Sequence, residues 1–144
     1  MEQLAENLFD LYMQLPRRFK KLFYACSQEQ DFQVGLSELK ILNELQKIGP
    51  CKMSELADAL VVTMGGLTPH MDKLVEKGFV RRFRDEDRDR RLVLVEITES
   101  GKKALKDVKE HFLATLEDYL SKFNERQKKD IASAVKTLRE TIDF

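Results

Sequence analysis

An arginine-rich segment in the second half of the chain carries the residue types best suited to binding a polyanion. All six residues from 85 to 90 are charged, and Arg88, Arg90 and Arg91 alternate there with carboxylates. Guanidinium groups form paired hydrogen bonds to phosphate and enter narrow, strongly negative minor grooves. A segment so dense in charge is costly to bury, so it must project into water. The alternative is a set of solvated ion pairs that contribute little energy.

Two apolar runs flank this segment and predict the strands of a hairpin. Phe79–Arg84 and Arg91–Ile97 are rich in Val, Leu, Phe and Ile, which a pleated and half-buried surface favours. The charged residues Asp85–Arg90 are then the turn between them. Because helices are predicted on both sides, the hairpin is expected to be a wing that extends from a helical body toward a polyanion.

Two short predicted helices precede the wing. Ser54–Leu60 and Met64–Lys77 have apolar residues at helical spacing, and Gly78 follows the second at the position where glycine ends helices. Only about three residues separate the two helices, and the hairpin follows the second helix at once. This order predicts a winged helix-turn-helix.

The start of the second of these helices has two interpretations. Thr63 can cap a helix that begins at the next residue. Alternatively, Thr68 is the cap and Pro69 takes the first helical position, which proline favours. The pair Gly65-Gly66 weakens the first turn in either case, because glycine costs about 1 kcal/mol relative to alanine inside a helix.

Apolar stripes predict further helices at both ends of the chain. The first runs from Glu2 to Cys26, and Pro16 should kink or split it. Ser37 is expected to cap the next helix, which ends at Gly49-Pro50. Cys51-Lys52 is expected to be an edge strand.

After the wing, Thr98 is expected to cap a long helix that reaches about Lys122, and Asn124 to cap the last one. The stripe of the last helix is Ile131, Val135, Leu138 and Ile142. We assign the first and the last two helices to a subunit interface, because their stripes exceed what one short domain can cover. The alternative is packing on their own domain.

These elements predict a mainly α fold with a small β-hairpin wing (α+β), organised as one structural domain with three regions. Residues 1–34 are the N-terminal dimerisation helix, residues 35–98 the winged helix-turn-helix lobe, and residues 99–144 the C-terminal dimerisation helices. The length of 144 residues suits such a domain.

The composition limits the possible functions without selecting one. There are 25 basic and 25 acidic residues, so the net charge is no evidence for nucleic acid, and DNA binding would require basic residues sorted to one surface. No signal peptide or membrane span is recognisable, so a soluble cytoplasmic protein is expected. Cys26 and Cys51 lack metal-ligand spacing and are expected to be reduced thiols, and a redox role for either is left open. No metal or cofactor is expected, and no catalytic motif indicates an enzyme.

Three segments resemble the MarR-type winged-helix transcriptional regulators. SELADAL (54–60) is similar to the first helix of their helix-turn-helix, and MDKLVEKGFVRR (71–82) to the end of their recognition helix. RDRRLVLVEITESG (88–101) is similar to their wing motif and is the most specific of the three. The resemblance implies a homodimer whose recognition helices enter the major groove and whose wings contact the adjacent minor groove. One departure is clear, since Gly65-Gly66 and Pro69 replace a Ser/Thr-rich opening with a central arginine.

The candidate DNA-binding residues lie on the wing and around the second helix. Arg91 matches the minor-groove arginine of the family, and Asp89, two residues earlier, is placed to hold its guanidinium. The other candidates are Ser54, Thr63, Gly65, Gly66, Thr68, Pro69, His70, Lys73, Arg88 and Arg90. Each of these is alternatively an uninvolved surface position.

The resemblance also implies a small-molecule effector that relieves repression. An aromatic set with one arginine on the first helix suits a small aromatic acid, although aromatic residues at helical spacing are more often core. The candidates are Tyr12, Arg17, Phe19, Phe23 and Tyr24. The function expected is therefore a sequence-specific, homodimeric repressor of double-stranded DNA operators. The alternative is a winged-helix protein-interaction module or co-regulator with weak or no specific DNA binding.

Overall fold

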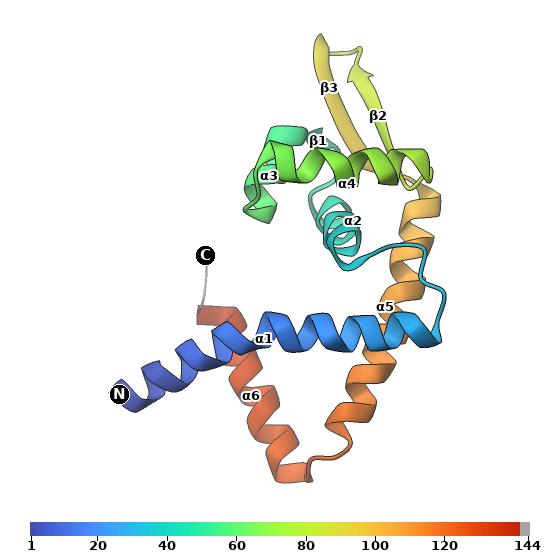
Figure 1. The fold of residues 1–144 in the computed structure, drawn as a ribbon. Coiled ribbons are helices and arrows are strands. Elements are labelled where there is room, and N and C mark those ends of the chain that lie inside the picture. Colours follow the sequence, from blue (N-terminus) through green and yellow to red (C-terminus); the bar gives the residue numbers. More distant parts are fainter. Residues whose placement is uncertain (142–144) are drawn as a thin grey trace. The chain divides into compact units, whose positions relative to one another are not determined.

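The computed structural model describes residues 1–141, which form helices α1 to α6 and one small antiparallel sheet (Figure 1). The elements are α1 Glu2–Glu29, α2 Leu36–Ile48, β1 Cys51–Lys52, α3 Met53–Leu60, α4 Met64–Glu76, β2 Val80–Asp85, β3 Asp89–Ile97, α5 Glu99–Leu120 and α6 Glu125–Thr141. The predicted class, mainly helical with a hairpin wing, is confirmed. The chain divides into two compact units, residues 1–110 and the residues from His111 onward, and the boundary falls within α5.

The core of the first unit lies among α2, α3, α4 and the sheet. Its strand order is β1-β3-β2, and the predicted edge strand pairs Cys51 with Val95. The largest fully buried side chains are Phe23, Leu42, Leu45, Leu56, Leu67, Met71, Leu74, Val80 and Val95. These positions follow the helical and strand periodicities of the sequence, so α4 is held by apolar packing along one side and leaves the other to solvent.

Of the four N-cap residues considered from the sequence, Thr63, Thr98 and Asn124 cap their helices in the structure and Ser37 does not. Thr63 caps α4, because its Oγ1 accepts the N–H of Gly66 at 3.0 Å, and this excludes the alternative start at Pro69. The prediction that Ser37 caps α2 was wrong. Gly35 is the cap, since its N–H donates to the Glu38 carboxylate at 3.0 Å and the helix already begins one residue before Ser37.

The wing strands extend closer to the tip of the hairpin than predicted. β2 extends to Asp85 and β3 begins at Asp89, so the predicted six-residue turn was wrong and only residues 86–88 connect the strands. Pairing continues because a register shift after Arg84 lets Asp85 face Asp89. Charged residues are accommodated in the ladder because the tip of the hairpin lies in solvent, beyond the helices (Figure 1).

Helix α1 passes through Pro16 without a break and ends three residues beyond the predicted Cys26. Its axis bends in the N-terminal half, as a proline inside a helix favours (Figure 1). Within α1, Phe23 and Cys26 alone are buried. Its exposed apolar residues are Leu4, Leu8, Phe9, Leu11, Tyr12, Met13, Leu15, Phe19 and Tyr24.

The second unit contains the end of α5 and helix α6. Asn124 caps α6 as predicted: its Oδ1 accepts the Gln127 N–H at 2.8 Å, and the Gln127 side chain accepts the Asn124 N–H at 3.1 Å. No described residue of α6 is buried, and its apolar side lines a groove of about 770 Å³. The predicted stripe residue Ile142 lies outside the described residues. In the part of the chain that the structure describes, no helix is long and apolar enough to cross a bilayer.

Candidate nucleic-acid interface

Helix α4 presents a mostly uncharged outer face in its first two turns. Leu67, Met71 and Leu74 turn inward, and His70 is half-buried. The exposed candidates on this helix are Gly65, Gly66, Thr68, Pro69 and Lys73. The Thr68 hydroxyl donates to the carbonyl oxygen of Met64 at 2.8 Å. Sequence-predicted residues are therefore brought together here on one exposed surface.

The wing places its arginines at the exposed end of the hairpin. The Arg91 side chain is 91% exposed, and its Nε lies 3.2 Å from Asp89 Oδ1. The same oxygen accepts the backbone N–H of Arg91 at 3.0 Å. The expected support of Arg91 by Asp89 is therefore present, and contact of Arg91 with DNA stays a prediction. Arg88 and Arg90 are also exposed.

An ion pair that sequence reasoning missed joins the wing to α4. Arg82 on β2 donates to Asp72 on α4 at 2.6 Å, with both side chains partly exposed. Asp72 lies on the outer face of α4, where its charge would repel phosphate. Arg82 offsets that charge and links the hairpin to α4. No local signal identifies the pair, because neither the ten-residue separation nor the residue types single it out among many charges.

Two other hairpin arginines make contacts within the wing. Arg81 pairs with Glu96 across the strands, and its guanidinium lies 4.5 Å from the ring centre of Phe83. Arg84 donates to the carbonyl oxygen of Arg90 at 3.0 Å. These contacts join β2 to β3 along the hairpin.

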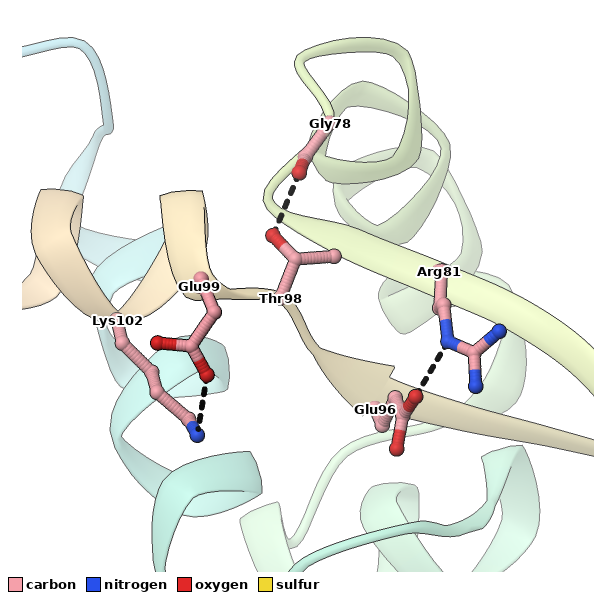
Figure 2. A network of polar contacts seen from close by, with 6 residues as sticks. All are labelled: Gly78, Arg81, Glu96, Thr98, Glu99 and Lys102. Atoms are coloured by element: carbon pink, nitrogen blue, oxygen red, sulfur yellow. Dashed lines mark hydrogen bonds and ion pairs between the residues drawn. The ribbon is translucent and has the colours of Figure 1, made fainter.

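A hydrogen-bonded junction connects the end of α4, the wing and the start of α5 (Figure 2). The Thr98 hydroxyl donates to the Gly78 carbonyl oxygen at 2.6 Å and accepts the Gly101 N–H at 3.1 Å. The Thr98 N–H donates to the Phe79 carbonyl oxygen at 3.0 Å. Thr98 thus caps α5, as predicted, and also closes the base of the wing. Gly78 has the positive φ, 77°, that its predicted place at the end of α4 requires.

A buried carboxylate at the other side of α4 was also missed. Glu38 on α2 has a 7% exposed side chain and pairs with Lys77 Nζ at 3.2 Å. The same Nζ donates to the carbonyl oxygen of Gln33 at 2.7 Å. Together with the Gly35 N–H, these bonds satisfy the carboxylate and join the segment after α1 to the C-terminal end of α4.

The two candidates for phosphate contact lie near the start of the helix-turn-helix elements. Ser54 is exposed in the first turn of α3, and Thr63 is exposed immediately before α4. The Thr63 hydroxyl oxygen already accepts the Gly66 N–H. Its O–H is therefore the group that remains to donate to a phosphate oxygen.

The candidate effector residues do not share one face of α1. At about 100° per residue, Tyr12, Phe19 and Phe23 share a face, and Arg17 and Tyr24 lie to one side of it. Phe23 is buried, packing edge-on against Tyr24 with ring centres 6.3 Å apart and against Phe32 at 5.6 Å. Phe23 therefore serves the core, and the other candidates are exposed.

Both cysteines are buried and reduced in the structure. Burial raises the pKa of the Cys51 thiol above its ordinary value, and the carboxylate of Glu55 raises it further. A thiol with a raised pKa is a poor nucleophile near neutral pH. Cys51 is therefore a core residue of β1.

Comparison with known proteins identifies the family. The MarR family model matches residues 35–93, which contain the helix-turn-helix and most of the wing. The uncharacterized HTH-type transcriptional regulator YpoP of Bacillus subtilis is 31% identical over 122 residues, covering 85% of this chain and 83% of that protein. This chain belongs to the MarR family. The expected resemblance is thereby confirmed, and the winged helix-turn-helix is that of a family of transcriptional regulators.

Solved structures of MarR family proteins share the fold over nearly the whole chain. A MarR family protein from Bacillus stearothermophilus aligns with a TM-score of 0.82 at 18% identity, covering 100% of this chain and 99% of that one. A mutant of MarR from Escherichia coli, complexed with operator DNA, aligns with a TM-score of 0.70 at 20% identity, covering 92% and 93%. The alignments therefore include the helices outside the helix-turn-helix.

Proposed function

We propose that this MarR family protein is a sequence-specific double-stranded DNA-binding regulator that acts as a homodimeric repressor relieved by a small-molecule effector. The observation that carries the proposal is the joined surface of α4 and the wing. Arg82 and Asp72 link the hairpin to α4, and the exposed Arg88, Arg90 and Arg91 lie at its far end. The operator-DNA complex of the structurally similar Escherichia coli MarR mutant supports DNA binding by a protein of this fold.

Homodimer formation is supported by apolar surface that the chain leaves uncovered. Nine large apolar side chains of α1 are exposed, and on α6 so are Val135 and Leu138. Exposed apolar residues that form a continuous patch mark interaction sites, whereas single scattered ones are ordinary on a protein surface. A second copy is the proposed occupant, because two recognition helices would then read a pseudo-palindrome with half-sites about 10 bp apart.

A small aromatic acid is the proposed effector class. Tyr12, Phe19 and Tyr24 are exposed aromatic residues of α1, and Arg17 on the same helix offers a cation for a carboxylate. Binding near the dimer surface would change the spacing of the two recognition helices and so lower DNA affinity.

Selection of bound duplexes from a random pool tests DNA recognition. The expected result is enrichment of a two-fold symmetric site, with an affinity that falls linearly with salt on logarithmic axes as phosphate contacts release counterions. The selection is repeated with candidate aromatic acids, which should lower the yield. Failure to bind any duplex at low salt, together with capture of a specific protein partner, would favour the interaction-module alternative.

Sedimentation equilibrium tests the dimer. The double variant Leu8→Glu, Leu15→Glu places charge on the exposed apolar side of α1 and should sediment as a monomer, with any loss of helical signal confined to the N-terminal half of α1. Gln14→Glu adds charge at an exposed polar position of the same helix and should remain dimeric. A wild-type protein that sediments as a monomer at micromolar concentration would contradict the proposal.

A further inference from the structure

The outer face of α4 offers few groups for reading bases by hydrogen bonds. Between Met64 and Glu76 the sequence contains no Arg, Asn or Gln, which make the paired contacts to guanine and adenine in the major groove. Asp72 is ion-paired with Arg82, and the Thr68 hydroxyl donates its proton to the backbone. Lys73 is the exposed long donor that remains on this helix, and its ammonium is a point charge without a paired geometry.

The same face exposes apolar atoms instead. Met64 is 46% exposed, and Pro69 is exposed five residues further along the helix. In the major groove, the one base-edge feature that apolar groups recognise is the C5-methyl group of thymine. Apolar residues at the opening of a recognition helix therefore favour thymine-containing sites.

Gly65 supports close approach of this face to a ligand. A Cβ atom built on Gly65 would meet no atom within 4 Å, so packing inside the protein does not require a glycine there. Glycine within a helix costs about 1 kcal/mol relative to alanine, so the residue lowers stability without a packing benefit. One internal explanation exists, because Pro69 lies four residues later and its ring crowds the Gly65 carbonyl group.

We propose that Met64, Gly65 and Pro69 form a surface that reads thymine C5-methyl groups, with Gly65 leaving room for the backbone to approach the base edges. The inference rests on the proposed function and specifies which chemical group α4 recognises. It accounts for the replacement of a Ser/Thr-rich opening and central arginine by glycine and proline. Discrimination at the positions under α4 then depends on methyl contacts, and the wing arginines supply the electrostatic part of binding.

Uracil substitution provides a direct test, because uracil pairs as thymine does and lacks the methyl group. A duplex selected by this protein from a random pool is resynthesised with one thymine at a time replaced by uracil, and affinity is measured by fluorescence anisotropy at fixed salt. We expect about fourfold weaker binding per methyl group at one or two thymines of each half-site. In Met64→Ala and Pro69→Ala proteins, that penalty should disappear at the contacted thymine.

The variant Gly65→Ala separates the two explanations for the glycine. Close approach to DNA predicts an unchanged or higher melting temperature with weaker binding of the unsubstituted duplex. Gly35→Ala is the matched control, because its Cβ also enters open space outside α4, and it should bind as the wild type does. A lowered melting temperature, or a raised one with unchanged affinity, overturns the role of Gly65. Uracil effects within twofold at every position overturn methyl reading, whereas failure to bind any duplex refutes the proposed function itself.

Discussion

The backbone of Phe79 occupies the space where residue 101 would carry its first side-chain atom. A Cβ atom on Gly101 would overlap the Phe79 carbonyl oxygen and lie 2.8 Å from Ile97 Cγ1. The start of α5 and the base of the wing therefore approach more closely than any other residue type permits. This contact explains the glycine of the wing motif by packing, since Gly101 is buried and helical.

The first prediction concerns this contact. Gly101→Ala should destabilise the protein by about 1–3 kcal/mol, because the backbone at Phe79 must shift to admit the methyl group. Urea unfolding followed by circular dichroism measures the change. Ser100→Ala, at the exposed neighbouring position, is the control and should change stability little. Equal unfolding midpoints for wild type and Gly101→Ala would show that the junction tolerates a Cβ.

The second prediction concerns the ion pair between the wing and α4. Arg82→Met should change the free energy of unfolding by about 1 kcal/mol or less, since both partners are partly exposed. Its effect on DNA affinity should be larger, because Asp72 then faces phosphate without a counter-charge. Asp72→Asn in the Arg82→Met background should restore much of the affinity. A double variant no better than Arg82→Met alone would assign Arg82 a direct DNA contact instead.

The third prediction concerns the wing tip. Arg91→Ala should weaken operator binding about tenfold and lower the slope of affinity against salt by about 1, because one cation is withdrawn from the DNA. Anisotropy titrations at several salt concentrations measure both quantities. Arg126→Ala, which removes an exposed cation from α6, should leave both unchanged. Unaltered binding by Arg91→Ala would remove this residue from the interface.

The fourth prediction concerns the buried carboxylate of Glu38. Lys77→Met removes its ion pair and the bond to Gln33, and should destabilise the protein by about 1–3 kcal/mol. Glu38→Gln added to Lys77→Met should recover part of that loss, because a neutral amide costs less to bury. Lys47→Met tests an exposed lysine in the last turn of α2 and should be near neutral. The absence of any recovery would mean that Lys77 acts through Gln33 alone.

The fifth prediction concerns pH. The folded protein raises the pKa of the Cys51 thiol above its ordinary value of 9.0, so the fold favours the neutral thiol. The stability that this provides is complete at pH values below 9.0. It is lost as the pH rises through the higher pKa of the folded state. Unfolding then releases a proton, which lowers stability by at most about 1.4 kcal/mol per pH unit for this one group. Urea unfolding between pH 8 and 10.5 should show a shallower decline in Cys51→Ala than in wild type. Parallel declines would show that the thiol is not involved.

The order of elements is predictable because local sequence supplies the helix ends. Thr98 and Asn124 are recognisable caps, and both accept the N–H groups expected of them. Ser37 misleads, because the carboxylate of Glu38 stabilises an earlier start that a side-chain rule does not detect. The ambiguity between Thr63 and Pro69 is resolved only when packing of the whole helix is known.

The candidate site is predictable only where its residues are close in sequence. Asp89 supports Arg91 over two residues, which a local motif can reveal. The bonds of Arg82 to Asp72 and of Lys77 to Glu38 connect separate elements, and many other pairings of the chain's charged residues were equally consistent with the sequence. The extent of the wing strands depends likewise on a register shift that residue types do not encode.

The exposed stripe of α1 has a consequence for how the protein would respond to its own abundance. Since α1 buries little more than Phe23 and Cys26 against its own chain, its N-terminal half has few tertiary contacts in a single copy. Ordering of that half and pairing of two copies would then be a single event. If two copies pair as proposed, the amount of dimer below its dissociation constant rises with the square of the protein concentration. Doubling the rate of synthesis would then quadruple the dimer, and a gene under its control would respond more steeply than in proportion to the amount of protein.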